Sequence, residues 1–380
     1  MMRILTAGES HGACNIAIIE GFPKGVRLEE SIINKDLLRR MHGAGRGKRM
    51  ALEQDQAKII AGLRNKFSLG SPIALLIANK DNQIFSQKKD LLKSLNVPRP
   101  AHADLSGSLK YQEKDIRNIL ERASARETVA RVACGSVCKQ FLSNFGISFA
   151  SFTVSVGQVY SGCKPKNTAE ILSKTKKSKL NCIDPLAEEK MIDLINECAD
   201  SHDTLGGIVE LWIDGLVAGI GNMMHFDRRL DAKLASGLMS IPAVKGVEVG
   251  LGFDYAKQRG SKSHDAIYYS SSKGFYRKTN NSGGIEGGLS TGEPVVLRLA
   301  MKPIATLTKP LESVNMVTKR KAKAPSVRSD TCAIAALGPI SESMAAISVF
   351  DSFLEKFGSD SLKEIQRSYL QYKRNIHRFK

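Results

Sequence analysis

A histidine set between glycines is the first residue in this sequence whose surroundings suit chemistry. The segment Gly8-Glu9-Ser10-His11-Gly12 follows a short strand-like stretch, 3–6. Glycine lets the backbone come close to a ligand, and histidine is the side chain that exchanges a proton near neutral pH. The segment therefore suits proton transfer to a bound molecule. It equally suits a polar turn whose histidine caps a neighbouring group.

Basic, glycine-rich segments are the second kind of candidate. Residues 39–49 (RRMHGAGRGKR) combine arginines with glycines, and several guanidinium forks can converge on one anion in such a loop. This pattern favours a small-anion site, with an exposed basic loop or a nucleic-acid contact as the alternatives. Residues 99–104 (RPAHAD) place a second histidine beside a carboxylate. They predict a second proton carrier or a structural turn.

Residues 121–128 (ERASARET) contain the S-x-x-E pattern of a capping box, immediately before a periodic apolar run. We expect Ser124 to cap a helix over about 124–142, whose N-terminus and flanking arginines would attract an anion. An ordinary capped helix without a ligand is the alternative. Two further segments, each a basic loop or salt-bridged turn when taken singly, are 302–306 (KPIAT) and 327–332 (VRSDTC).

The elements that must position these segments mix without regular βαβ alternation, which predicts an α+β fold. Apolar, β-branched stretches predict strands, and 3.6-residue periodicity predicts helices. The strands are expected over 73–78, 148–156, 208–213 and 294–299, and the helices over 188–198, 230–239, 342–357 and 362–374.

No linker rich in proline, glycine or serine divides the chain, so we expect one domain, 1–380, with a basic helical tail from about 360. The lysine-rich stretch 164–179 is interpreted as an exposed insertion. A weak similarity between 205–208 and 282–285 would be consistent with an internal duplication.

The composition gives a net charge of +18, which implies anionic partners: nucleic acid, an acidic membrane surface or phosphorylated small molecules. Only 6% of residues are aromatic, which disfavours a nucleic-acid-binding protein. The sequence contains neither a P-loop nor a G-x-G-x-x-G strand–helix turn, so it does not support a kinase or a dinucleotide-binding fold.

No stretch approaches the ~20 apolar residues of a membrane span, and the acid at Glu9 disfavours a secretory signal, so a cytoplasmic protein is expected. Seven scattered cysteines without a C-x-x-C pair suggest packed thiols and no metal site.

Taken together, in this order and spacing, the motifs resemble the chorismate synthase family. GESHG, RASARET and RSDTCAIAALGPISESM are similar to that family's three signatures, and the resemblance runs from Arg3 to about Phe357. Further similar segments are GRGKRM, KDNQIF, RPAHAD, SIPAVKGVEVG, GGIEGGLSTGEP and KPIAT.

The resemblance implies a lyase that converts 5-enolpyruvylshikimate 3-phosphate to chorismate and phosphate with reduced FMN and no net redox change. It implies two sheets sandwiching helices, a homotetramer, and NADPH only if the enzyme reduces its own flavin. The catalytic positions that match are His11, His102 and Asp330. The flavin-binding positions that match are Arg122, Ala123, Ser124, Pro242, Ala243, Gly287, Lys302, Pro303, Ile304, Ala305, Thr306 and Arg328. The positions matching substrate or NADP anion binding are Arg40, Arg46 and Arg49.

The sequence departs from the family's pattern at two places. Ala101 stands where the family usually has glycine in R-P-G-H-A-D, which could shift His102 slightly. Residues 222–225 (NMMH) are unlike the family's usual sequence and put the shape of that loop in doubt.

Overall fold

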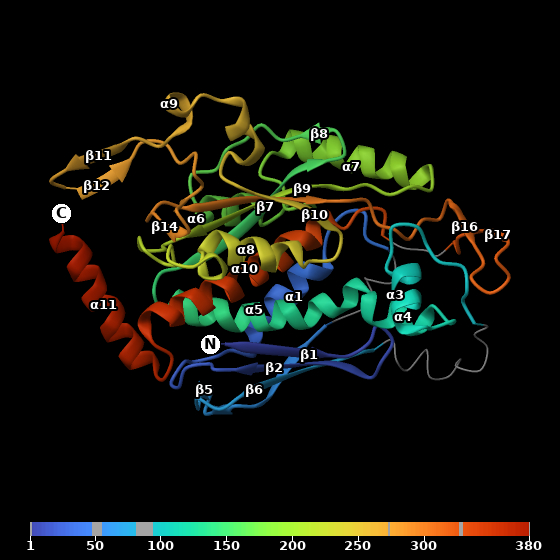
Figure 1. Cartoon of the computed structure of the whole chain (residues 1–380), viewed down its shortest axis with the longest axis horizontal. Helices are drawn as coiled ribbons and strands as arrows, with labels where there is room; N and C mark the ends of the chain where they lie inside the picture. Colours follow the sequence, from blue (N-terminus) through green and yellow to red (C-terminus); the bar gives the residue numbers. More distant parts are fainter. Residues whose placement is uncertain (1, 48–54, 81–93, 273, 327–329, 380) are drawn as a thin grey trace.

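Two antiparallel sheets enclose a layer of helices (Figure 1). The computed structural model describes residues 2–47, 55–80, 94–272, 274–326 and 330–379. The expected α+β class and the helices sandwiched between sheets are confirmed. The predicted anion- and flavin-binding residues Arg49 and Arg328 lie outside the described residues.

The first sheet has the order β1-β2-β6-β3, and every neighbouring pair is antiparallel. Ile19, Ile73, Leu75 and Ile77 point inward and are fully buried, as the two-residue period of a strand requires. Its strands are β1 (Arg3–Ala7), β2 (Cys14–Glu20), β3 (Ala57–Ala61) and β6 (Ile73–Ala78).

The second sheet has the order β10-β15-β9-β7-β8, again antiparallel throughout. The predicted strand 148–156 has the observed bounds, and the predictions for β9 and β15 differ by one or two residues at each end. The strands are β7 (Ser148–Val156), β8 (Val159–Tyr160), β9 (Gly207–Asp214), β10 (Val244–Val249) and β15 (Val295–Met301). Short hairpins complete the strands: β4 (Leu63–Arg64), β5 (Phe67–Ser68), β11 (Ile267–Ser270), β12 (Gly274–Arg277), β13 (Ile285–Glu286), β14 (Leu289–Ser290), β16 (Glu312–Val314) and β17 (Lys321–Lys323).

The helices between the sheets carry the core. The Phe350 ring stacks on Phe22 at 5.3 Å and meets Phe141 edge-on at 4.8 Å. The inner helices are α1 (Glu30–Met41), α5 (Thr128–Ser143), α8 (Leu230–Met239) and α10 (Ile334–Phe357). The others are α3 (Asp104–Tyr111), α4 (Arg117–Ala123), α6 (Thr168–Thr175), α7 (Pro185–Asp200), α9 (Gly260–Ser263) and α11 (Leu362–Arg378).

Helix α10 is long and apolar enough to cross a membrane, but 78% of its most apolar window is buried inside the protein, as in a core helix. It begins eight residues before the predicted start. The prediction missed these residues because Gly338-Pro339 is a pattern that usually ends or kinks a helix. Proline lacks the N–H that would bond to the Ala335 carbonyl. Asn181 Nδ2 donates to that oxygen instead, at 2.9 Å. A side chain distant in the sequence therefore lets the helix continue through the proline.

The stretch 164–179 is not a wholly exposed insertion. It contains α6, whose Ile171 is fully buried. Ile171 packs on Ala150 and Phe152, on the outer face of the second sheet, and on Ile183 of the loop before α7. The many lysines in the sequence obscured the apolar face of a short helix.

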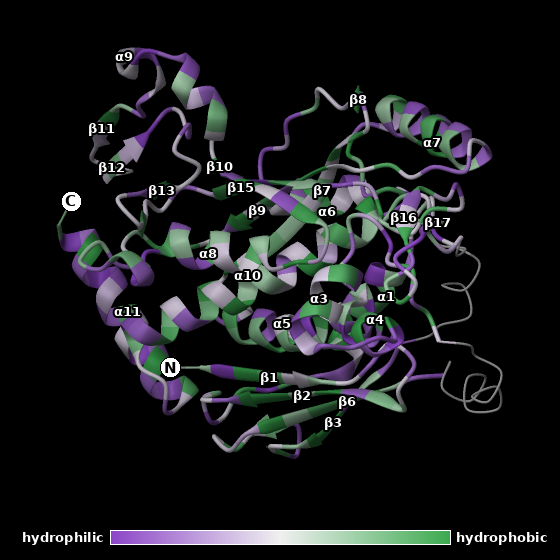
Figure 2. Ribbon diagram, turned by 45° about the vertical axis from the view of Figure 1, so that its right-hand side comes forward, coloured by the Kyte–Doolittle hydropathy of each residue, from purple (hydrophilic) through white to green (hydrophobic). Residues whose placement is uncertain are grey.

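Hydrophobic residues line β2, β3 and β6 in Figure 2, whereas α11 is largely hydrophilic.

Candidate active site

The His11 loop leaves the end of β1 and is held by the last turn of α4. Gly8 has φ +124°, and a Cβ there would lie 2.6 Å from the Cys14 carbonyl oxygen, so the turn requires glycine. His11 donates its Nδ1–H to Glu121 Oε1 at 2.7 Å, and its backbone N–H to Glu121 Oε2 at 2.8 Å. The Ser10 N–H donates to the Glu121 carbonyl at 2.9 Å. One residue of α4 thus holds two residues of the loop.

Arg122 holds the same loop from its other end. Its guanidinium donates to the carbonyl oxygens of Gly8 at 2.9 Å and Thr6 at 3.0 Å, and to Thr6 Oγ1 at 2.9 Å. Thr6 belongs to β1, the edge strand of the first sheet, and Gly8 follows directly after that strand. The observed contacts of Arg122 therefore secure the backbone that carries His11.

Ser124 does not begin the long helix that the capping-box pattern predicted. It caps a single 3₁₀ turn over Ala125–Glu127, where its hydroxyl accepts from the Arg126 N–H at 3.3 Å. Helix α5 starts after that turn. The Glu127 carboxylate pairs with Arg131 at 2.9 Å, one turn further along. The expected helix is therefore present, but its first turn is irregular.

Arg40 lies behind the loop in a buried polar network. Asp55 Oδ2 receives Arg40 Nη1 at 3.4 Å and Arg126 Nη1 at 3.0 Å. Arg126 also donates to Asn79 Oδ1 at 2.6 Å, and Asn79 Nδ2 donates to the Ser10 carbonyl at 2.9 Å. Both guanidiniums are less than a tenth exposed. The network connects α1 to the backbone next to His11.

Arg46 and Asp330, predicted separately, form one ion pair. Arg46 Nη1 lies 2.8 Å from Asp330 Oδ2, and the Gly47 N–H donates to Oδ1 at 2.7 Å. The Arg46 Nε donor is buried, and within the described ranges it has no hydrogen-bond partner. The glycine-rich loop is thus fastened to the segment that contains Asp330, and a buried cationic donor remains for a ligand.

His102 is the second histidine held by a carboxylate. Its Nδ1 lies 2.6 Å from Asp104 Oδ1, and Arg99 Nε donates to Asp104 Oδ2 at 2.8 Å. Burial raises the pKa of Asp104, but the hydrogen bonds from His102 and Arg99 outweigh burial and hold it well below its ordinary value. Arg99 also donates to Thr306 Oγ1 at 3.0 Å. This contact brings the RPAHAD segment to the KPIAT segment.

Ala101, where the RPAHAD segment departs from the pattern that it resembles, has a left-handed backbone with φ +60°. An L-residue with a Cβ is disfavoured there by about 1–2 kcal/mol. We expect Ala101→Gly to raise the free energy of unfolding by about 0.5–1 kcal/mol, net of the extra freedom of glycine in the unfolded chain. Urea unfolding of both proteins measures the difference. The matched control is Ala235→Gly in the interior of α8, where glycine should lower stability by about 0.5–1 kcal/mol. A loss of stability in both variants would show that Ala101 is not strained.

Lys302 lies between the predicted flavin segments. Its backbone N–H donates to the Ala243 carbonyl at 2.9 Å, and its Nζ donates to the Ala101 carbonyl at 3.0 Å. Burial and the nearby Lys245 lower the pKa of Lys302. A half-buried lysine beside a second cation is an environment that a bound anion would stabilise.

Thr204 and Leu205 tie two of the motif segments together. Thr204 Oγ1 donates to the Ile304 carbonyl, and the Leu205 N–H donates to the Thr331 carbonyl, both at 2.9 Å. The KPIAT segment and the segment after Asp330 are therefore neighbours.

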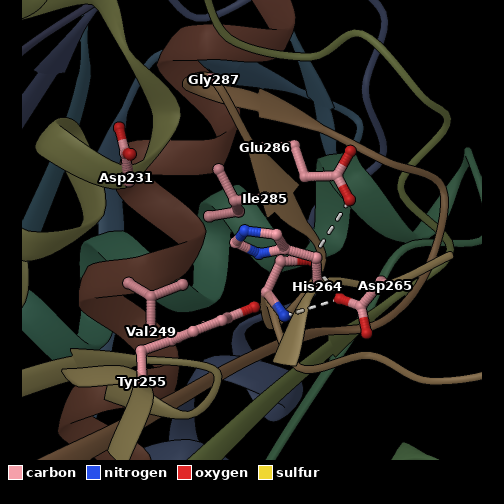
Figure 3. Close-up of a pocket in the computed structure, with 9 residues that line it drawn as sticks. Asp231, Val249, Tyr255, His264, Asp265, Ile285, Glu286 and Gly287 are labelled. Carbon is pink, nitrogen blue, oxygen red and sulfur yellow. Dashed lines mark hydrogen bonds between the residues drawn. The ribbon is translucent and has the colours of Figure 1, made fainter. Parts of the chain in front are cut away.

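Gly287 lies apart from the other predicted flavin positions. It lines a pocket of about 550 Å³ with Asp231, Tyr255 and His264 (Figure 3). The neighbouring Gly288 carbonyl accepts from the Leu230 N–H at the start of α8, whereas Pro242 follows the end of that helix. A 10-residue helix is about 15 Å long. In a single copy of the chain, Gly287 is thus about one helix length from Pro242.

No sequence motif assigns a role to Glu121, Asp55 or Asn79. Glu121 immediately precedes the RASARET motif, so its position beside a signature was the available signal. Asp55 and Asn79 carry no motif at all. They could be found only from the fold, which brings α1, β6 and the 3₁₀ turn together.

Comparison with known proteins identifies relatives over nearly the whole chain. Residues 2–354 match the family described as chorismate synthase. The chain is 47% identical to the chorismate synthase of Geobacter metallireducens, over 98% of each protein. It is also 47% identical to that of Alkaliphilus metalliredigens, over 98% of this chain and 99% of the relative.

Among solved structures, one titled as the crystal structure of chorismate synthase superposes with a TM-score of 0.82 at 39% identity. The superposition covers 99% of this chain and 98% of the other. The sequence and structure comparisons thus agree over the first sheet, the inner helices and the second sheet.

Proposed function

This chain belongs to the chorismate synthase family, and we propose that His11, His102 and Asp330 carry its reaction within a cationic pocket. The enzyme is a phosphate-eliminating lyase of the shikimate pathway. It catalyses the last step, the 1,4-anti elimination of phosphate from 5-enolpyruvylshikimate 3-phosphate to give chorismate. The observation that carries the proposed site is that each of the two motif histidines is fixed at Nδ1 by a carboxylate.

His11 supplies a proton to the leaving phosphate. Its Nδ1–H is committed to Glu121, so proton exchange takes place at Nε2. General acid catalysis of this kind contributes about 10²–10⁴-fold. The loop bends at Gly8 because only glycine fits there, which lets the substrate come close to the histidine.

His102 acts as the second proton-exchanging group, held by Asp104 and by Arg99. The low pKa of Asp104 keeps its carboxylate charged, so that it accepts the hydrogen bond from the ring throughout the neutral range. Thr306, held by Arg99, couples this histidine to the KPIAT segment. A substitution in that segment should therefore change the position of Arg99 and of the His102 ring.

Asp330 and Arg46 act as a pair in this proposal. Asp330 orients the Arg46 guanidinium and the Gly47 backbone, and Arg46 retains a buried Nε donor for a phosphate or carboxylate. A guanidinium in a desolvated site binds such groups strongly. Arg49 and Arg328 are assigned to anion and flavin binding by the family resemblance alone.

The family requires reduced flavin, and the residues here fit one. The buried Arg46 donor and the crowded, half-buried Lys302 both favour an anionic ligand. Reduced FMN would be held by Lys302–Thr306, Pro242, Ala243 and Arg122–Ser124. Gly287 is about one helix length from Pro242, so within one chain it would contact the flavin only across that greater distance. When bound, reduced FMN supplies electron density as phosphate leaves and regains it when hydrogen is lost, without net redox change.

The same proposal includes a cytoplasmic homotetramer that acts on a small phosphorylated substrate. NADPH is needed only if the enzyme reduces its own flavin. The test of the function is anaerobic phosphate release from 5-enolpyruvylshikimate 3-phosphate. Product should form over many turnovers per reduced FMN and should not form with oxidised FMN alone. Stoichiometric flavin oxidation would contradict the proposal.

We expect FMN affinity to fall as the pH rises through the lowered pKa of Lys302. An anionic ligand favours the charged ammonium, so binding is full while Lys302 is protonated and weakens when it loses its proton. Fluorescence titration of FMN between about pH 7 and about pH 10 measures this loss. Lys302→Arg stays charged over that range and should remove most of the pH dependence. An equally steep loss in the arginine variant would assign it to another group.

A further inference from the structure

We infer that Glu121 is a positioning residue for His11, fixing both the ring tautomer and the backbone from which the ring projects. This inference rests on the proposed role of His11. It concerns a carboxylate in α4 that does not itself touch substrate in our proposal. Both of its oxygens bond to one residue, Oε1 to the ring and Oε2 to the backbone N–H, at 2.7 and 2.8 Å.

The double contact decides which ring nitrogen can exchange a proton. A carboxylate at Nδ1 holds the proton on that nitrogen, so the neutral ring accepts and the cationic ring donates at Nε2. The second contact, to the backbone, fixes where the ring starts. The side chains of His11 and Glu121 are only 16% and 25% exposed, so competition from water is reduced.

The carboxylate is itself held by a supported helix. The next residue, Arg122, donates to the carbonyls of Thr6 and Gly8 and fixes α4 to the strand before the loop. Ile119 of the same helix packs on Gly107 of α3, where an added Cβ would come within 2.4 Å of its Cγ2. Helix α4 is therefore held to β1 by Arg122 and to α3 by packing, in addition to the two hydrogen bonds from His11 to Glu121.

A third histidine shows what distinguishes this arrangement. His225 has the same kind of contact, with Nδ1 at 2.6 Å from Asp227, but its side chain is 58% exposed and that of Asp227 is 62% exposed. Glu121 differs in its burial and in its second bond to the backbone of the histidine. These two features indicate a positioning role for Glu121, beyond an ordinary surface ion pair.

The test compares Glu121→Gln with Glu121→Asp, and with Glu189→Gln on an exposed site of α7 as the matched control. The first readout is the His11 tautomer, from ring ¹⁵N shifts of the protein without substrate, assigned by the loss of that signal in His11→Asn. In Glu121→Gln we expect a mixture of tautomers where the parent has one. Glu121→Asp, one methylene shorter, should give an intermediate result and keeps the test informative if the glutamine variant does not fold. The control should match the parent.

The second readout is kcat/KM. Glu121→Gln should lower kcat/KM about 10- to 100-fold. FMN affinity should be unchanged. An unaltered His11 tautomer in Glu121→Gln would overturn the inference, whatever the activity. Full activity of His11→Ala would instead overturn the proposed role of His11 and would leave the tautomer result standing.

Discussion

Replacing His11 with alanine should lower kcat by about 10²–10⁴-fold, the usual contribution of a positioned proton donor. FMN binding should persist, because the residues proposed to hold the flavin lie on other segments. Anaerobic phosphate release with saturating reduced FMN measures the loss, and flavin fluorescence measures binding. Adding imidazole should restore part of the activity if the missing function is proton supply.

His225→Ala is the matched control for that experiment. His225 also places Nδ1 within hydrogen-bond distance of a carboxylate, at 2.6 Å from Asp227, but it is exposed on the loop before α8 and stands outside the proposed site. Its removal should leave kcat within about 2-fold, because exposed pairs of this kind contribute little. Full activity in His11→Ala would remove His11 from the mechanism, and equal losses in both variants would indicate a general structural effect.

Local pattern was enough to predict much of this fold. The strand 73–78 and the helix 230–239 have the predicted bounds, because their apolar periodicity and their punctuation coincide. Where the two conflict, the prediction failed. Pro339 hid the first turns of α10, whose continuation depends on Asn181, and lysines hid the buried Ile171 of α6. Both helices depend on contacts with residues distant in the sequence.

The site divides in the same way. The motifs GESHG and RPAHAD were enough to predict His11 and His102 from the sequence. The carboxylate that bonds to His102 is two residues away in the same motif. The carboxylate for His11 is 110 residues away, so no local pattern could assign it. The pairing of Arg46 with Asp330 spans more than twice that interval, across two motifs that had been interpreted independently.

The net charge of +18 also has more than one use. It predicted a cationic pocket, and Arg46 and Lys302 fit that prediction. Yet Arg40, Arg122 and Arg126 make contacts that hold backbone and buried carboxylates in place. An arginine in a signature motif can therefore serve the architecture of a site as well as its ligand. Burial and partner, which the sequence does not give, distinguish the two uses.

The largest effect on stability is expected at Glu342, in the middle of α10. This carboxylate is fully buried and receives both Nη atoms of Arg39 at 2.7 Å, with Ser151 Oγ also at 2.7 Å. Lys139 Nζ lies 3.5 Å away. Glu342→Gln leaves the half-buried Arg39 and Lys139 with less compensation. Removing one partner of a buried ion pair costs about 3–5 kcal/mol, and the partial exposure of both cations favours the lower end. Urea unfolding of the folded variant measures that loss.

The same network makes a pH-dependent prediction. Burial raises the pKa of Glu342, but Arg39 and Lys139 outweigh burial and hold it at about 2, below its ordinary 4.5. A lowered pKa in the folded state means that its contribution to stability is complete above pH 4.5 and is lost as the pH falls toward about 2. The parent should lose stability over that interval, and Glu342→Gln should lose less.

A paired substitution separates charge from packing in this network. Arg39→Met with Glu342→Leu removes both charges, and Asp36 then remains to pair with Lys139, whose Nζ lies 2.7 Å from its Oδ2. Replacing both members of a buried pair with apolar residues is often close to neutral, so the double variant should unfold at a higher urea concentration than Glu342→Gln. If the double variant is the less stable of the two, the shape of the Glu342 side chain and its bond to Ser151 matter more than the buried charge. An acid limb unchanged from the parent in both variants would assign the loss of stability at low pH to other carboxylates.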